Sequence, residues 1–189
     1  MTKMTDVRTT RVADVVRELP PSGIRRFFDL VIGMDDVVSL GVGEPDFQTP
    51  LAVRQRAIRE LELGNTTYSS NHGLMEMRVE LAAWLSARYG INYSPASEML
   101  ITVGASEAID LALRAILNPG DEVIVVEPCY VSYVPTVRLA GGTPIIFPVL
   151  QEDGFRINFD HLRPLITPRT KALMVNYPSN PTEIGRAHV

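Results

Sequence analysis

Residues 123–126, Val-Ile-Val-Val, are continuously apolar and are bounded by charged residues at both ends. A strand that is apolar on both of its faces has to be covered on both faces, as in a parallel sheet. Similar apolar runs recur through the C-terminal part of the chain and alternate with segments of helical character. We expect strands at residues 99–103, 122–126, 144–149 and 171–176, and helices at residues 106–117, 130–139 and 161–165. This order predicts an α/β fold with a mainly parallel sheet flanked by helices.

The N-terminal part of the chain has a different, mostly helical pattern. Ser22 can cap a helix that runs to about residue 33, and residues 37–40 are expected to form a short strand. Pro50 stands where proline opens a helix, here to about residue 63. A further helix is expected at residues 74–89, and we interpret its apolar stripe as core packing. The stripe consists of Leu74, Met77, Leu81, Trp84 and Leu85.

Composition narrows the class of function. The formal net charge is -4 and Lys and Arg are scattered, so no basic patch points to nucleic acid or to a membrane surface. The single cysteine, Cys129, excludes a disulfide within the chain and a cysteine-rich metal site. The histidines are not at metal-ligand spacing, and we assign no metal site. No apolar run is long enough for a transmembrane helix, and the polar N-terminus lacks a signal core, so we expect a cytoplasmic protein.

Ligands of open parallel sheets bind at the carboxyl ends of the strands, so the residues that follow strands matter most. Gly104, Ala105 and Ser106 lie between a predicted strand and a predicted helix. Small residues let backbone N–H groups approach an anion, the helix N-terminus adds roughly half a positive charge, and Ser106 adds a hydroxyl donor. A phosphate site is one interpretation of this turn. A plain helix cap that binds no ligand is the other.

Two further segments follow strands. Glu127-Pro128-Cys129-Tyr130 places an aromatic ring at the carboxyl edge of the sheet, where Tyr130 either stacks on a flat ligand or packs in the core. We expect Cys129 to be a small buried side chain rather than a nucleophile. The segment at residues 176–182, Asn-Tyr-Pro-Ser-Asn-Pro-Thr, is a rigid polar turn. The amide of Asn180 is able to donate to a ring oxygen, although turn formation alone also explains the segment.

The loop at residues 41–47, Gly-Val-Gly-Glu-Pro-Asp-Phe, does not have the spacing of a phosphate-binding loop. Its glycines suit a loop whose backbone N–H groups face the carboxylate of a ligand. Glu44 and Asp46 are interpreted as local turn partners.

Taken in order, four motifs make the chain resemble the class I/II aminotransferases, which are fold-type I enzymes dependent on pyridoxal 5'-phosphate (PLP). They are Gly-Glu-Pro-Asp-Phe from residue 43, Tyr-x-x-x-x-Gly-x-x-x-x-Arg from residue 68, Gly-Ala-Ser-Glu-Ala from residue 104, and Asn-Tyr-Pro-Ser-Asn-Pro-Thr from residue 176. The resemblance spans almost all of residues 20–182. It implies a segment of the small domain and arm at residues 1–45 and a partial PLP-binding large domain at residues 46–182.

The resemblance also implies a role for single residues. Gly104, Ala105 and Ser106 would bind the PLP phosphate, Tyr130 would stack on the pyridine ring, and Asn180 would hydrogen-bond the phenolic oxygen of the ring. Tyr68 would reach the phosphate of PLP in the partner subunit of a homodimer, and Gly43 would meet the substrate carboxylate. Relatives often carry Gln where this chain has Glu107, so we expect the Glu107 carboxylate to point away from the phosphate.

The Schiff-base lysine of such enzymes is absent from this chain. The chain holds only two lysines, Lys3 in the polar N-terminal tail and Lys171 at the start of a predicted strand. Residues 183–189, Glu-Ile-Gly-Arg-Ala-His-Val, match the translation of a common sequencing adapter preceded by one G. We therefore expect these residues to be a non-native tail and the chain to be an N-terminal fragment.

Three functions are compatible with these residues. The first is an aminotransferase that moves an amino group between an amino acid and a 2-oxo acid, with the fragment inactive as it stands. The second is a PLP-dependent carbon-sulfur lyase of the same fold, and the third is a binding module without catalysis. The amino acid substrate is not readable from this part of the sequence.

Overall fold

The computed structural model describes residues 11–20 and 46–182. The contacts between Cα atoms divide the chain into two compact units. The described part of one consists of residues 11–20 and 103–182, and that of the other of residues 46–102. The helix predicted at residues 22–33, the strand at residues 37–40, Gly43 and the tail at residues 183–189 lie outside the described residues. The division into segments 1–45, 46–182 and 183–189 stays a prediction.

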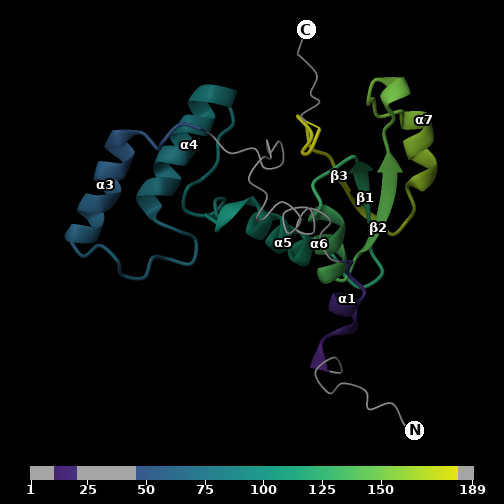
Figure 1. Ribbon diagram of the computed structural model, residues 1–189, viewed down its shortest axis with the longest axis horizontal. Helices are drawn as coiled ribbons and strands as arrows, with labels where there is room; N and C mark the ends of the chain where they lie inside the picture. Colours follow the sequence, from purple (N-terminus) through teal and green to yellow (C-terminus); the bar gives the residue numbers. More distant parts are fainter. Residues whose placement is uncertain (1–10, 21–45, 183–189) are drawn as a thin grey trace, which may run out of the picture. The chain divides into compact units, whose positions relative to one another are not determined.

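The unit at residues 46–102 contains helices α3 (Leu51–Glu62) and α4 (Met75–Tyr89), close to the predicted bounds (Figure 1). Pro50 precedes α3, and Gly90 ends α4 in the left-handed conformation that caps helices. The predicted core role of the α4 stripe is wrong for part of it. Leu74, Met77 and Trp84 are each more than half exposed, because the described residues of this unit provide no sheet for the stripe to pack on.

The polar loop of this unit is fixed at its C-terminal end. Gly73 has a φ of +88°, and a Cβ there would lie 2.6 Å from the Cβ of Ile101. The N–H of Ile101 donates to the carbonyl of His72 at 3.1 Å. The guanidinium of Arg78, which is buried, donates to the carbonyl of Pro95. The close approach at Gly73 requires a residue without a side chain.

The other unit contains a three-stranded sheet, built from β1 (Glu122–Glu127), β2 (Thr143–Pro148) and β3 (Thr170–Met174). The strand order is β2-β1-β3, and both neighbours run parallel to β1 (Figure 1). Ile124 pairs with Ile145 on one side and with Leu173 on the other. The predicted α/β fold with a parallel sheet is confirmed.

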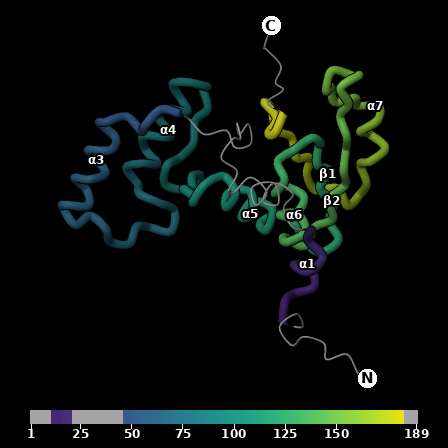
Figure 2. Tube along the Cα trace, viewed as in Figure 1, coloured from purple at the N-terminus to yellow at the C-terminus, as the bar shows by residue number. Residues whose placement is uncertain are grey.

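Both faces of β1 are covered, as its apolar sequence indicates. Val123 and Val125 pack with Val137 of α6 (Tyr133–Leu139) and with Leu113 of α5 (Gly104–Ile116). On the opposite face, a second cluster is formed by Ile124, Val126, Phe147, Val149 and Leu162. Leu162 belongs to α7 (Phe159–Leu162), which leads into a 3-10 helix at Arg163–Leu165. The tube trace in Figure 2 shows α7 and α6 on opposite sides of the strands.

The remaining elements of this unit are short. They are α1 (Asp14–Arg17) and a 3-10 helix at Gln151–Asp153. The strand predicted at residues 99–103 is not present in the described residues, since no strand pairs with this segment. A strand needs a neighbouring strand to satisfy its backbone N–H and C=O groups. An apolar sequence pattern does not reveal whether such a neighbour is present.

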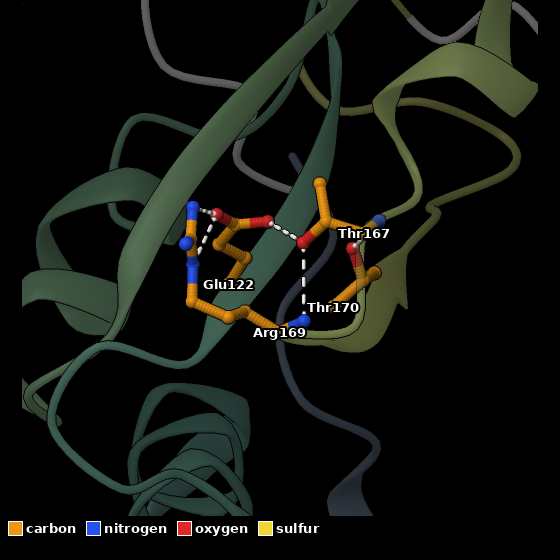
Figure 3. A network of polar contacts seen from close by, with 4 residues as sticks. All are labelled: Glu122, Thr167, Arg169 and Thr170. Atoms are coloured by element: carbon orange, nitrogen blue, oxygen red, sulfur yellow. Dashed lines mark hydrogen bonds and ion pairs between the residues drawn. The ribbon is translucent and has the colours of Figure 1, made fainter.

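A polar network closes the amino end of the sheet (Figure 3). Glu122, the first residue of β1, is 4% exposed, and its carboxylate accepts from the Thr167 hydroxyl at 2.6 Å. Arg169 donates to the same carboxylate, and the N–H of Glu122 donates to the Arg169 carbonyl at 2.8 Å. The network lies beside a bulge, because the pairing of β1 with β3 shifts by one residue after Glu122. It fixes how β3 enters the sheet.

Candidate active site

The first turn of α5 carries the predicted phosphate-binding residues. Gly104 has a φ of +81°, and nothing lies within 4 Å of a Cβ built on it. Ala105 and Ser106 are exposed, and no side chain caps the helix from Val103. The first N–H groups of a helix have no partner within the helix, so this turn presents backbone donors beside the Ser106 hydroxyl. These donors suit the acceptor oxygens of a phosphate.

The position of this turn is set by the apolar face of α5. Leu113 is buried against β1 and α6, and Ile109 packs on the same cluster. Helices α5 and α6 lie side by side (Figure 1). The turn is therefore held on a helix rather than on a free loop.

Glu107 returns to the turn on which α5 begins. Its carboxylate accepts a hydrogen bond from the N–H of Val103, the residue that precedes the helix. The carboxylate thus takes up a donor at the start of the helix and brings a negative charge to the first turn. Any anion that binds this turn has to tolerate that charge.

Tyr130 follows β1 and is partly buried. Its ring meets the ring of Tyr133 edge to face, with 5.8 Å between centroids and 78° between planes. Tyr133 packs against the core of α5, α6 and β1, and its burial raises the pKa of its phenol. Sequence reasoning missed this role of Tyr133, although the spacing of the two tyrosines is that of neighbours on a helical turn.

Cys129 also follows β1 and packs against the same core cluster. Burial, and then the nearby Glu127 carboxylate, raise the pKa of its thiol above the usual value. The thiolate is the reactive form of cysteine, so this environment disfavours nucleophilic chemistry. Cys129 is partly buried rather than fully buried, and it packs on the core as expected.

The segment that follows β3 is tied to its neighbours by two hydroxyl groups. The hydroxyl of Ser179 donates to the carbonyl of Pro128 at 2.9 Å, and Ser179 is 8% exposed. The hydroxyl of Tyr177 donates to the carbonyl of Phe155 at 3.2 Å. Asn180 itself is exposed. The structure thus brings the segment of Asn180 against the segment of Tyr130, as the shared edge of the sheet predicts.

A narrow hollow of about 10 Å³ lies between these segments, with room for about one water molecule. Its lining includes Pro128, Phe155, Tyr177 and Ser179, together with Val126, Val149, Asn176 and Thr182. The hollow is too small for a cofactor ring.

Two predicted residues lie outside the described part of this unit, since Gly43 is not among the described residues and Tyr68 belongs to residues 46–102. Tyr68 lies in the other unit, where its side chain is fully exposed. Lys171 is exposed near the start of β3, at the end of the strand away from Asn180, as expected. Within residues 11–20 and 46–182, no cluster of side chains could hold a metal ion and no helix is long and apolar enough to cross a membrane.

Known proteins resemble this chain in sequence. The putative aminotransferase YugH of Bacillus subtilis is 48% identical over 92% of this chain, and the aspartate aminotransferase of Pyrococcus abyssi is 45% identical over 86% of it. The chain spans 45% of the length of the first and 42% of the second. It is thus equivalent to less than half of these relatives.

The fold gives the same result. A solved structure of Thermus thermophilus aspartate aminotransferase, a single mutant, matches 90% of this chain with a TM-score of 0.82 and 40% identity, over 46% of that chain. The solved structure of a Pyrococcus protein called protein-A1 matches 89% of this chain with a TM-score of 0.84 and 43% identity, over 43% of that chain. The family model for aminotransferase class I and II matches residues 35–183. The chain belongs to the aminotransferase class I and II family.

Proposed function

We propose that this chain provides much of the cofactor-binding part of a PLP-dependent aminotransferase, which transfers an amino group between an amino acid and a 2-oxo acid. The observation that carries the proposal is the hydrogen bond from Ser179 to Pro128, which joins the segments of Asn180 and Tyr130 at the carboxyl edge of the sheet. The relatives named above are aminotransferases, which favours transamination over elimination of a carbon-sulfur bond.

The residues present fit PLP. The phosphate would be held by the N–H groups of Gly104, Ala105 and Ser106 and by the Ser106 hydroxyl, at a turn with open space beside Gly104. Tyr130 would stack on the ring, supported edge-on by Tyr133. Asn180 would donate its amide N–H to the phenolic oxygen. PLP, when bound, supplies the electron sink for chemistry at the amino acid.

Two residues have proposed roles outside this edge. Tyr68 carries a fully exposed aromatic ring, and we assign it to the phosphate of PLP in the partner subunit of a homodimer. Gly43 would meet the substrate carboxylate through its backbone N–H. The lysine that attacks the cofactor aldehyde would come from the part of the aminotransferase that this chain does not span.

A hybrid enzyme tests the proposal. It joins residues 1–182 of this chain to the C-terminal part of Thermus thermophilus aspartate aminotransferase that lies beyond the matched region. We expect the purified hybrid to bind PLP. When an amino acid is added without a 2-oxo acid, the bound PLP should be converted to pyridoxamine phosphate. A 2-oxo acid should reverse the change, as a ping-pong cycle requires.

The Thermus enzyme, measured in parallel, is the control for the contributed half. A folded hybrid that binds no PLP contradicts the proposal. Release of ammonia without pyridoxamine phosphate supports the lyase alternative instead. The source DNA is also sequenced beyond codon 182 by a method without adapters. The protein that the resulting reading frame encodes is tested in the same assay.

A further inference from the structure

The hydroxyl of Ser179 has one polar contact that spans a long stretch of chain. Its acceptor, the Pro128 carbonyl, lies 51 residues earlier in the sequence and 2.9 Å away. Ser179 directly precedes Asn180, and Pro128 lies two residues before Tyr130. This hydrogen bond therefore connects the two segments that carry the proposed ring contacts, Asn180 and Tyr130.

Burial makes this hydrogen bond matter. Ser179 is 8% exposed, while its neighbour Asn180 is exposed to solvent. Pro128 is partly buried, and a carbonyl shielded from water is costly to leave without a donor, so it favours one position of the Ser179 hydroxyl. Because backbone geometry links adjacent residues, the position of the Asn180 side chain follows that of Ser179.

A second hydrogen bond from the same segment has a different acceptor. The Tyr177 hydroxyl reaches Phe155, in the loop after β2, at 3.2 Å. Tyr177 is 41% exposed, so water replaces this hydrogen bond readily. The link to Phe155 does not involve the segment of Tyr130. Of these two hydrogen bonds, only that of Ser179 connects the segments of the two proposed ring contacts, Asn180 and Tyr130.

We propose that Ser179 is a positioning residue for the cofactor, which sets the amide of Asn180 relative to the ring of Tyr130. This inference rests on the proposed function. Ser179 acts through Asn180 and does not touch the ring. Its removal should therefore change how the bound ring titrates as well as how tightly the cofactor binds.

The test uses the hybrid enzyme and the variants Ser179→Ala, Ser179→Thr and Tyr177→Phe. Apo protein is titrated with PLP, and the visible absorption of the bound cofactor is followed against pH. In Ser179→Ala we expect about five- to tenfold weaker binding of PLP, corresponding to the loss of one partly buried hydrogen bond. We also expect the visible absorption to titrate at higher pH, because a displaced Asn180 no longer favours the deprotonated form.

The companion variants separate positioning from loss of stability. Ser179→Thr keeps the hydroxyl and should restore both the affinity and the titration. Tyr177→Phe removes a hydrogen bond from the same segment and should leave the titration unchanged. If Ser179→Ala does not fold by circular dichroism, Ser179→Cys replaces it with a weaker donor of similar size, and the same direction is expected.

The outcomes distinguish the two proposals. If the parent hybrid folds and binds no PLP, the proposed function fails, and the role of Ser179 fails with it. If the parent hybrid binds PLP and Ser179→Ala titrates like the parent, the positioning role alone is overturned. An equal shift in Tyr177→Phe also overturns it, because the shift would then reflect general loosening of the segment.

Discussion

The guanidinium of Arg169 donates two hydrogen bonds to one carboxylate oxygen of Glu122, from Nε at 2.8 Å and from Nη2 at 2.5 Å (Figure 3). The Glu122 side chain is 6% exposed and that of Arg169 is 68% exposed. The Thr167 hydroxyl, and then Arg169, hold the pKa of the Glu122 carboxyl below its usual value. The pair thus connects the start of β1 to the turn before β3 through a charged group that prefers its ionised form.

Glu122→Gln should lower the thermal midpoint of the hybrid enzyme by several degrees near neutral pH. A carboxyl with a lowered pKa in the folded state stabilises the fold above the pKa of the unfolded chain, and this contribution is lost as pH falls through the lowered folded pKa. The difference between the two proteins should therefore shrink in acid. Midpoints measured over a pH series check this.

Glu152→Gln is the matched control, since Glu152 is exposed on the loop after β2. It should leave the midpoint nearly unchanged at every pH. A difference between Glu122→Gln and the parent that stays constant from neutral to acid pH would show that the charge of Glu122 contributes nothing.

Gly73→Ala should destabilise the unit at residues 46–102 more than Gly90→Ala does. Both glycines have positive φ, 88° and 68°, so both substitutions carry backbone strain of roughly 1 kcal/mol. At Gly73 the new Cβ also meets Ile101 at 2.6 Å, whereas nothing lies within 4 Å at Gly90. Overpacking adds about 1–3 kcal/mol.

Both variants are made in the hybrid enzyme and unfolded in urea. Hydrogen exchange of peptides from residues 46–102 then reports the loss of stability of this unit in each variant. Equal losses at the two positions would mean that Ile101 moves aside at no cost. Gly73 would then be required only for its backbone conformation.

The parallel sheet was predictable because the information for it is local. Residues 123–126 are apolar on both faces, and the structure buries Val123 and Val125 on one face and Ile124 and Val126 on the other. The strand at residues 99–103 was not, because a strand exists only with a partner, and an apolar run does not reveal whether one is present.

The sequence predicted which residues form the candidate site. It did not predict the residues that hold them in place. Tyr130 and Asn180 stand out because each follows a strand. Their supports, Tyr133 and Ser179, act through an aromatic contact and through a hydrogen bond to a residue 51 positions away. Contacts of this kind depend on the register of the sheet, so sequence spacing alone does not reveal them.

Cys129 should react slowly with a thiol-alkylating reagent in the folded hybrid enzyme. Burial raises the pKa of its thiol, so the thiolate fraction at about pH 8 is below that of a free cysteine. Mass spectrometry of the peptide that contains Cys129 follows the reaction over time. Reaction in urea, where the chain is unfolded, provides the reference rate, and an equally fast reaction of the folded protein would contradict protection by the partial burial of Cys129.

Glu107→Gln should tighten binding of PLP to the apo hybrid enzyme by about two- to fivefold, the range expected from about 0.3–1 kcal/mol for a charge at a helix N-terminus. The Glu107 carboxylate accepts from the N–H of Val103 and lies at the turn proposed to hold the phosphate dianion. Gln keeps an oxygen that can accept this hydrogen bond and removes the like charge.

The effect of Glu107→Gln should shrink as salt is raised, because ions screen an exposed charge. Glu152→Gln removes an equal charge from the same unit away from α5 and should not change the affinity. Weaker binding of PLP in Glu107→Gln would mean that the carboxylate supports the phosphate site by accepting the hydrogen bond from the N–H of Val103. In that case the order it imposes on the first turn outweighs its repulsion of the phosphate.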